Sequence, residues 1–123
     1  ILITHNLSIV SSFCDRVIVM YAGKIVENAP VEKLFTEPKH PYTRRLIQSI
    51  PRLDLQSSKE LYSIKGSPPN LLDKKKYCAF SNRCPHFMNI CKKSPPNTYL
   101  FEDNHSASCW LYHSKFQKTG GPK

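Results

Sequence analysis

The sequence has few of the features that a membrane-spanning or secreted chain would carry. No run of about 18 apolar residues occurs in its 123 residues, so no helix of this chain is expected to cross a membrane. It does not open with an initiator Met or with a basic segment followed by an apolar stretch, so no signal peptide is predicted. Residues 1–4 instead form an apolar run typical of a buried strand. We therefore expect the chain to be cut from a larger protein.

Glycine and acidic residues are also scarce. None of the four glycines belongs to a Gly-x-x-x-x-Gly-Lys-Ser/Thr phosphate-binding loop, which argues against a self-sufficient nucleotide-hydrolysing domain. Nine acidic residues face 18 basic ones, giving a formal net charge of +9 that favours acidic partners such as nucleic acid, anionic lipid or an acidic protein surface. The basic residues form no stripe, and their one tight cluster is Lys74–Lys76.

Five cysteines are present, and four of them lie in the last third of the chain, at Cys78, Cys84, Cys91 and Cys109. An odd number without a signal peptide argues against a secreted disulfide scaffold. The pattern fits one four-thiolate metal site, with Cys14 as a buried structural thiol. The sequence lacks paired Cys-x-x-Cys knuckles, and the spacing by itself leaves zinc and an iron–sulfur cluster both open.

The first 50 residues have the pattern of an α/β segment. We expect residues 1–4 to form a buried strand of a parallel sheet, followed by His5 and a helix that Asn6 caps. A second buried strand, residues 17–21, turns at Ala22-Gly23 into an antiparallel return over residues 24–27. Two further helices are predicted, one from Pro30 through Phe35 and one beginning at Pro41.

The remaining sequence changes character twice. Residues 51–76 are polar and lysine-rich and are predicted to be a linker or crossing segment. Residues 77–112 hold the four cysteines among prolines and aromatics, so we expect an irregular, metal-stabilised extension. Residues 113–123 are predicted to be a flexible basic tail. The predicted fold class is thus α/β for residues 1–50, followed by a cysteine-rich extension.

Several ordered motifs resemble one protein family. Residues 1–10 (ILITHNLSIV) and 14–27 (CDRVIVMYAGKIVE) resemble the C-terminal half of the ATPase domain of ABC transporters, a P-loop domain. Residues 38–43 (PKHPYT), 66–71 (GSPPNL) and 83–86 (RCPH) are similar to the C-terminal extension of the ATP-binding subunits of oligopeptide and dipeptide importers. The resemblance extends from residue 1 to about residue 112.

The resemblance implies a catalytic role for His5. In this family the Thr-His pair is the switch motif, and by resemblance His5 contacts the γ-phosphate of ATP and helps to orient the attacking water. Asn6 replaces the more usual aspartate and can still cap a helix. ATP and Mg²⁺ are the implied cofactors. The phosphate loop, the Leu-Ser-Gly-Gly-Gln signature and the acidic Mg²⁺-holding strand end are all absent, so this chain alone is expected to be inactive.

The resemblance also implies a metal and partners. Cys78, Cys84, Cys91 and Cys109 correspond to ligands of a 4Fe–4S cluster, with Zn²⁺ as the alternative. The implied partners are a second ATPase subunit, two transmembrane permease subunits and a peptide-binding protein, at the cytoplasmic face of the membrane. The isolated chain is expected to risk self-association through unpaired strand edges. The alternative function, a basic metal-binding nucleic-acid module, rests on charge, cysteines and interleaved aromatics.

Overall fold

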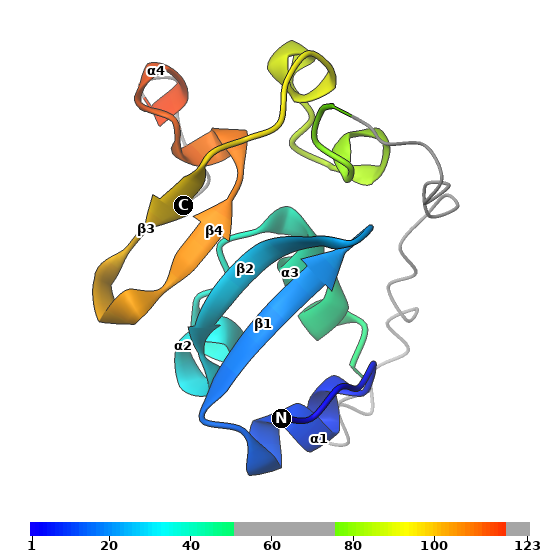
Figure 1. Ribbon diagram of the computed structural model, residues 1–123, viewed down its shortest axis with the longest axis vertical. Coiled ribbons are helices and arrows are strands. Elements are labelled where there is room, and N and C mark those ends of the chain that lie inside the picture. Colours follow the sequence, from blue (N-terminus) through cyan, green and yellow to red (C-terminus); the bar gives the residue numbers. More distant parts are fainter. Residues whose placement is uncertain (51–75, 118–123) are drawn as a thin grey trace, which may run out of the picture.

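A four-stranded antiparallel sheet in the order β1-β2-β4-β3 organises the chain, as Figure 1 shows. The computed structural model describes residues 1–50 and 76–117. Two strands, β1 (Arg16–Tyr21) and β2 (Lys24–Pro30), come from the first part, and two shorter ones, β3 (Thr98–Leu100) and β4 (Ser106–Ser108), come from the second. The sheet therefore joins two segments that the sequence analysis had treated as separate.

The predicted hairpin is confirmed. Ala22 and Gly23 both have positive φ, at 49° and 75°, which is the backbone that a two-residue hairpin turn requires. The return strand continues beyond Glu27 to Pro30, and the register shifts between Val19 and Met20. The side chains of β1 alternate strictly between exposed and buried, so the strand buries only one of its faces.

The helical predictions are confirmed as well. Helix α1 (Leu7–Phe13) is capped by the Asn6 side chain, α2 spans Val31–Thr36, and α3 spans Pro41–Gln48. Proline suits the first position of α3 because that position needs no intrahelical N–H. The side chain of His40 caps α3 by accepting a hydrogen bond from the Tyr42 N–H at 3.1 Å. None of the described helices is long and apolar enough to cross a membrane.

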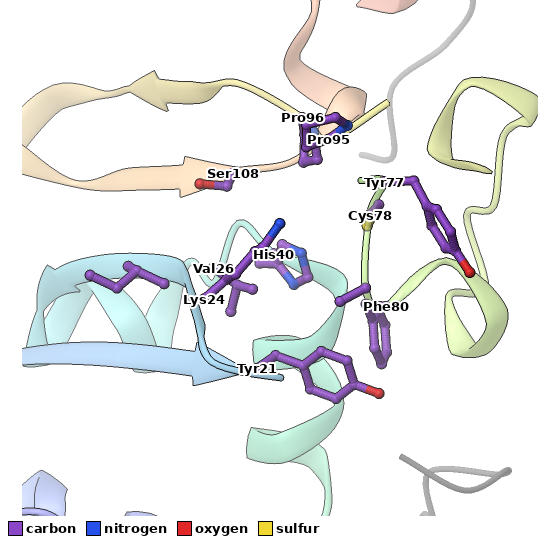
Figure 2. Close-up of a pocket in the computed structure, with 12 residues that line it drawn as sticks. Tyr21, Lys24, Val26, His40, Tyr77, Cys78, Phe80, Pro95, Pro96 and Ser108 are labelled. Carbon is purple, nitrogen blue, oxygen red and sulfur yellow. The ribbon is translucent and has the colours of Figure 1, made fainter. Parts of the chain in front are cut away.

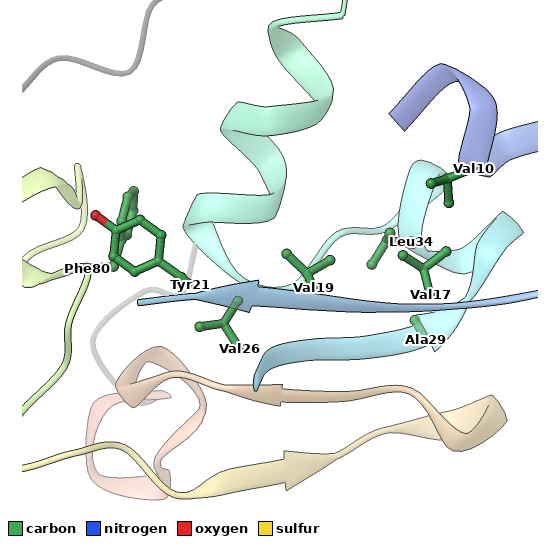
Figure 3. Close-up of a cluster of buried hydrophobic side chains, with 8 residues drawn as sticks. All are labelled: Val10, Val17, Val19, Tyr21, Val26, Ala29, Leu34 and Phe80. Atoms are coloured by element: carbon green, nitrogen blue, oxygen red, sulfur yellow. The ribbon is translucent and has the colours of Figure 1, made fainter. Parts of the chain in front are cut away.

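The hydrophobic core lies between the hairpin and these helices. Val17, Val19 and Tyr21 point from β1 toward the helical side (Figure 3). The cluster is completed by Val10, Val26, Ala29, Leu34 and Phe80. Phe80 comes from the cysteine-bearing segment and is 1% exposed, so that segment contributes directly to the core. Cys14, predicted as a buried structural thiol, is half-buried and packs against the cluster.

The prediction of a buried parallel strand at residues 1–4 is wrong in the described residues. Residues 1–4 form no strand and are exposed, with Ile3 at 95%, and all strand pairs are antiparallel. A central parallel strand needs a hydrogen-bonding neighbour, and no described strand pairs with this run. The strand predicted as buried over residues 17–21 is buried on one face only, since Ile18 and Met20 are 55% and 56% exposed.

The C-terminal part is irregular, as predicted, and is built mostly of short 3₁₀ turns at 81–83, 89–92, 102–104 and 110–112. Its strand β4 nevertheless pairs with β2, with Glu27 opposite Ala107 and Asn28 opposite Ser106. A short helix α4 (Ser114–Gln117) occupies the start of the predicted tail. The linker, apart from residue 76, and the end of the tail, residues 118–123, lie outside the described residues.

Candidate functional site

His5 lies in the short turn that leads into α1. The Thr4 hydroxyl oxygen accepts the Asn6 N–H at 3.0 Å, and the Asn6 side-chain oxygen accepts the Ser8 N–H at 3.0 Å. These two bonds fix the backbone on either side of the histidine. His5 itself is exposed, and no hydrogen bond joins its ring to another described residue. The side chain is therefore accessible to a ligand.

Three of the four C-terminal cysteines lie at the short 3₁₀ turns: Cys84 follows the turn 81–83, Cys91 is in the turn 89–92, and Cys109 precedes the turn 110–112. The backbone N–H of Cys78 donates to the Cys91 carbonyl at 3.1 Å. A negative charge on any one of Cys78, Cys84 and Cys91 would raise the pKa of the Cys109 thiol, so the four sulfur atoms are within electrostatic range of one another. All five cysteines are free thiols. All four predicted ligands therefore lie in the C-terminal part of the fold, whereas His5 lies at the start of α1.

Burial and nearby positive charges shift the pKa values of these thiols in opposite directions. Burial raises the pKa of the Cys84 thiol to about 11 and that of Cys109 to about 12, because the thiolate form loses its hydration. Burial also raises the pKa of Cys78. The positive charges of Lys24 and Arg45 act in the other direction, on Cys78 and Cys84 respectively. Without a metal the neutral thiol is the stable form at neutral pH.

The ligand geometry of a metal centre is not formed. Within residues 1–50 and 76–117, no three side chains of the His, Cys, Asp or Glu type are grouped closely enough to hold a metal ion. The described residues therefore do not show the metal-stabilised extension that the sequence predicts. The donor set is nevertheless the soft four-thiol kind that zinc and iron–sulfur clusters use.

A buried polar cluster that the sequence analysis missed holds the extension on the sheet. The Glu27 carboxylate accepts the N–H groups of Lys39 and His40 at 2.6 and 2.9 Å. Its oxygen Oε1 also lies 2.7 Å from Nε2 of His105. Glu27, His40 and His105 are each at most 2% exposed. The partner of His105 lies 78 residues away in sequence, so no local pattern indicates this contact.

Further contacts extend this docking between segments 16–40 and 101–112. The Arg16 guanidinium donates twice to the Asn104 carbonyl, at 2.8 and 3.1 Å, and the Tyr112 hydroxyl donates to the Lys39 carbonyl at 2.7 Å. Lys33 pairs with Asp103 at 3.1 Å on the surface. The extension is thus held on the sheet by these hydrogen bonds and by the pairing of β4 with β2.

The raised thiol pKa values predict slow alkylation. At pH 8 a pKa of about 11 in place of the ordinary 9 leaves roughly 100-fold less thiolate, so Cys84 of the folded chain should react with iodoacetamide about 100-fold more slowly than in the unfolded chain. Cys109 should be slower still. Mass spectrometry of timed samples measures both rates. Equal rates in the folded and unfolded chains would contradict the burial of these thiols.

The same shifts give the metal-free chain a pH-dependent stability. Cys84 and Cys109 each have a higher pKa in the folded chain than the ordinary value of 9. Their neutral thiols therefore contribute to the free energy of unfolding below pH 9. This contribution is lost as the pH rises through about 11 for Cys84 and about 12 for Cys109.

Comparison with known proteins places the chain in a family. The family model described as "Oligopeptide/dipeptide transporter, C-terminal region" matches residues 26–91. The dipeptide transport ATP-binding protein DppD of Bacillus subtilis is 45% identical over 111 residues, covering 90% of this chain and 33% of DppD. The oligopeptide transport ATP-binding protein OppD of Salmonella typhimurium is 47% identical over 96 residues, covering 78% of this chain and 28% of OppD.

A third relative covers the chain completely. OppD of Bacillus subtilis is 40% identical over all 123 residues, which correspond to 34% of its own length. The chain belongs to the family of oligopeptide and dipeptide transporter ATP-binding proteins and represents their C-terminal region. It spans about a third of the length of the relatives that it matches. The nucleic-acid alternative gains no support from these matches.

Proposed function

We propose that this chain is the C-terminal part of an ATP-binding subunit that couples ATP hydrolysis to the uptake of oligopeptides or dipeptides by an ABC importer. The observation that carries the proposal is the match of residues 26–91 to the family region, together with 40–47% identity to transport ATP-binding proteins over most of the chain. In the proposed assembly the subunit works with a second ATPase subunit, two permease subunits and a peptide-binding protein, at the cytoplasmic face of the membrane.

His5 is the proposed catalytic residue of this chain. Its imidazole is exposed beside a backbone that Thr4 and Asn6 hold in place, so it can accept or donate a hydrogen bond at a γ-phosphate and an attacking water. The phosphate loop and the Mg²⁺-binding acid would come from elsewhere in a longer subunit. This chain therefore supplies one group of the site and is expected to be inactive by itself.

Exposed apolar side chains support this division of labour. Ile18 and Met20 on β1 and Ile9 and Phe13 on α1 are all between 42% and 81% exposed. Large apolar side chains that are exposed on two elements are typical of surfaces that another part of a protein covers. Because the relatives are about three times as long as this chain, the proposed partner of this surface is the remainder of the same ATPase domain.

We also propose that Cys78, Cys84, Cys91 and Cys109 are the ligands of a 4Fe–4S cluster, with Zn²⁺ as the alternative. The electrostatic influence of Cys78, Cys84 and Cys91 on the Cys109 thiol supports this, and so do Lys24 and Arg45, whose charges favour the thiolates that a metal needs. When bound, such a group would cross-link a segment that has little regular secondary structure. The thiols would have to lose their protons and move together to ligate it.

Anaerobic reconstitution of the 123-residue chain with iron and sulfide tests this site. We expect matched iron and sulfide with a broad visible absorbance, lost in Cys91→Ser and retained in the control Cys14→Ser. Stoichiometric zinc without iron would favour the alternative. Failure to retain either metal would refute the metal site and leave the family assignment unaffected.

Turnover measurements test the proposed ATPase role. The purified 123-residue chain should show no Mg²⁺-dependent ATP hydrolysis, whereas a subunit of the relatives' length carrying this segment should hydrolyse ATP. Hydrolysis by the short chain alone would contradict the assignment of the phosphate loop to another part of the subunit.

A further inference from the structure

A small cavity lies between the β1–β2 turn and the cysteine-bearing segment (Figure 2). Its volume is about 100 Å³, somewhat smaller than the roughly 150 Å³ cavity that is known to bind benzene in another protein. Val26, Phe80, Pro95 and Pro96 form apolar walls. The cavity thus has room for a molecule of only a few non-hydrogen atoms.

The polar groups around this cavity are hydrogen-bond donors. Lys24 lines it from the hairpin, and the His40 ring faces it from the start of α3 (Figure 2). The Nδ1 atom of His40 accepts the Tyr42 N–H, so the ring proton is on Nε2, which has no partner among the described residues. His40 is 2% exposed, and burial lowers its pKa to about 4, so the ring stays neutral at pH 7.

No acidic side chain lines this cavity in the described part of the chain. The nearby carboxylate of Glu27 is satisfied by the backbone N–H groups of Lys39 and His40 and by His105. Tyr77, Cys78 and Ser108 also line the cavity. An ammonium group and a buried imidazole N–H beside apolar walls match a ligand that has one anionic end and a short apolar body.

We propose that this cavity is a binding site for a small aliphatic monocarboxylate. The carboxylate would accept hydrogen bonds from Nζ of Lys24 and Nε2 of His40, and its alkyl chain would lie against Val26, Phe80 and the Pro95-Pro96 pair. The cavity is too small for a drug-sized molecule or a nucleotide. This site is separate from His5 and does not depend on the proposed ATPase role, but it shares Lys24 and Cys78 with the proposed metal site, so it is proposed for the metal-free chain.

Titration of the ¹⁵N-labelled 123-residue chain with butyrate at pH 7 and constant ionic strength tests the proposal. We expect saturable shifts of amide signals from residues that line the cavity. Lys24→Gln should weaken binding about tenfold or more, because it removes a charge-assisted hydrogen bond. The matched control Lys92→Gln changes an exposed lysine outside the cavity lining and should bind like the parent chain.

A second variant tests whether binding requires the volume of the cavity. Ala79 lines the cavity and is not fully buried, so Ala79→Leu should fill the space and abolish binding while the rest of the amide spectrum is unchanged. Butyramide, which has the same shape without the charge, should bind much more weakly than butyrate. The proposal is overturned if butyrate causes no saturable shifts, if inorganic phosphate binds as well as butyrate, or if Lys24→Gln and Lys92→Gln have equal affinity.

Discussion

Replacing Glu27 with alanine is expected to lower the free energy of unfolding by about 3–5 kcal/mol, because it leaves the groups that now donate to a buried carboxylate without a partner. Two of these groups are the backbone N–H groups of Lys39 and His40, and the third is the ring of His105. Glu27 is 1% exposed, so water cannot take the place of its oxygens without opening the structure. Urea denaturation of the two chains measures the difference.

The matched control is Glu32→Ala, which removes an exposed glutamate from α2 and should change the unfolding free energy little. His105→Ala should destabilise the chain by a similar amount to Glu27→Ala, and the double variant should cost clearly less than the sum of the two. Additive effects, or a loss no larger than that of the control, would contradict a direct role of this pair in holding the extension on the sheet.

Replacing His5 with alanine in a subunit of the relatives' full length is expected to reduce ATP hydrolysis by about 100-fold or more while ATP binding is retained. The reason is that His5 is exposed and accessible for contact with a γ-phosphate and water, whereas the tight binding of phosphates and Mg²⁺ depends on groups outside this chain. Steady-state turnover and equilibrium binding of a fluorescent ATP analogue distinguish the two effects.

Asn6→Asp is the control for His5. Either side chain can accept the Ser8 N–H and cap α1, so the backbone next to His5 should keep its position and turnover should remain near normal. Near-normal turnover in His5→Ala would refute the catalytic role of the histidine. A loss of ATP binding together with turnover would indicate a defect in the structure of the site.

Local patterns in the sequence predicted the parts of the fold that local interactions determine. The hairpin followed from β-branched strands around Ala22-Gly23, and the starts of α1 and α3 followed from Asn6 and Pro41. The same reasoning was wrong for residues 1–4, because an apolar run becomes a strand only when a neighbouring strand pairs with it, and no described strand does so.

The features that the sequence did not reveal depend on distant contacts. Strand β4 is the three-residue segment Ser-Ala-Ser, which carries no apolar pattern, and only its pairing with β2 makes it a strand. His105 finds its partner 78 residues away, and its nearness in sequence to Cys109 suggested a different environment. The composition predicts four thiol ligands, but within residues 1–50 and 76–117 no three side chains of a ligand type are grouped closely enough to hold a metal.

The pairing of β2 with β4 also sets an order of events during synthesis. The β1–β2 hairpin leaves the ribosome long before the residues that cover its outer edge, and until then β2 has unpaired backbone groups and an unpartnered acid at Glu27. Contacts between residues this far apart in sequence form slowly, and exposed strand edges promote association between chains. A chain that ends before His105 would retain its hairpin and its helices, but the edge of β2 would stay unpaired and could associate with other chains. In this fold, residues that are translated later therefore protect the edge of β2 from aggregation.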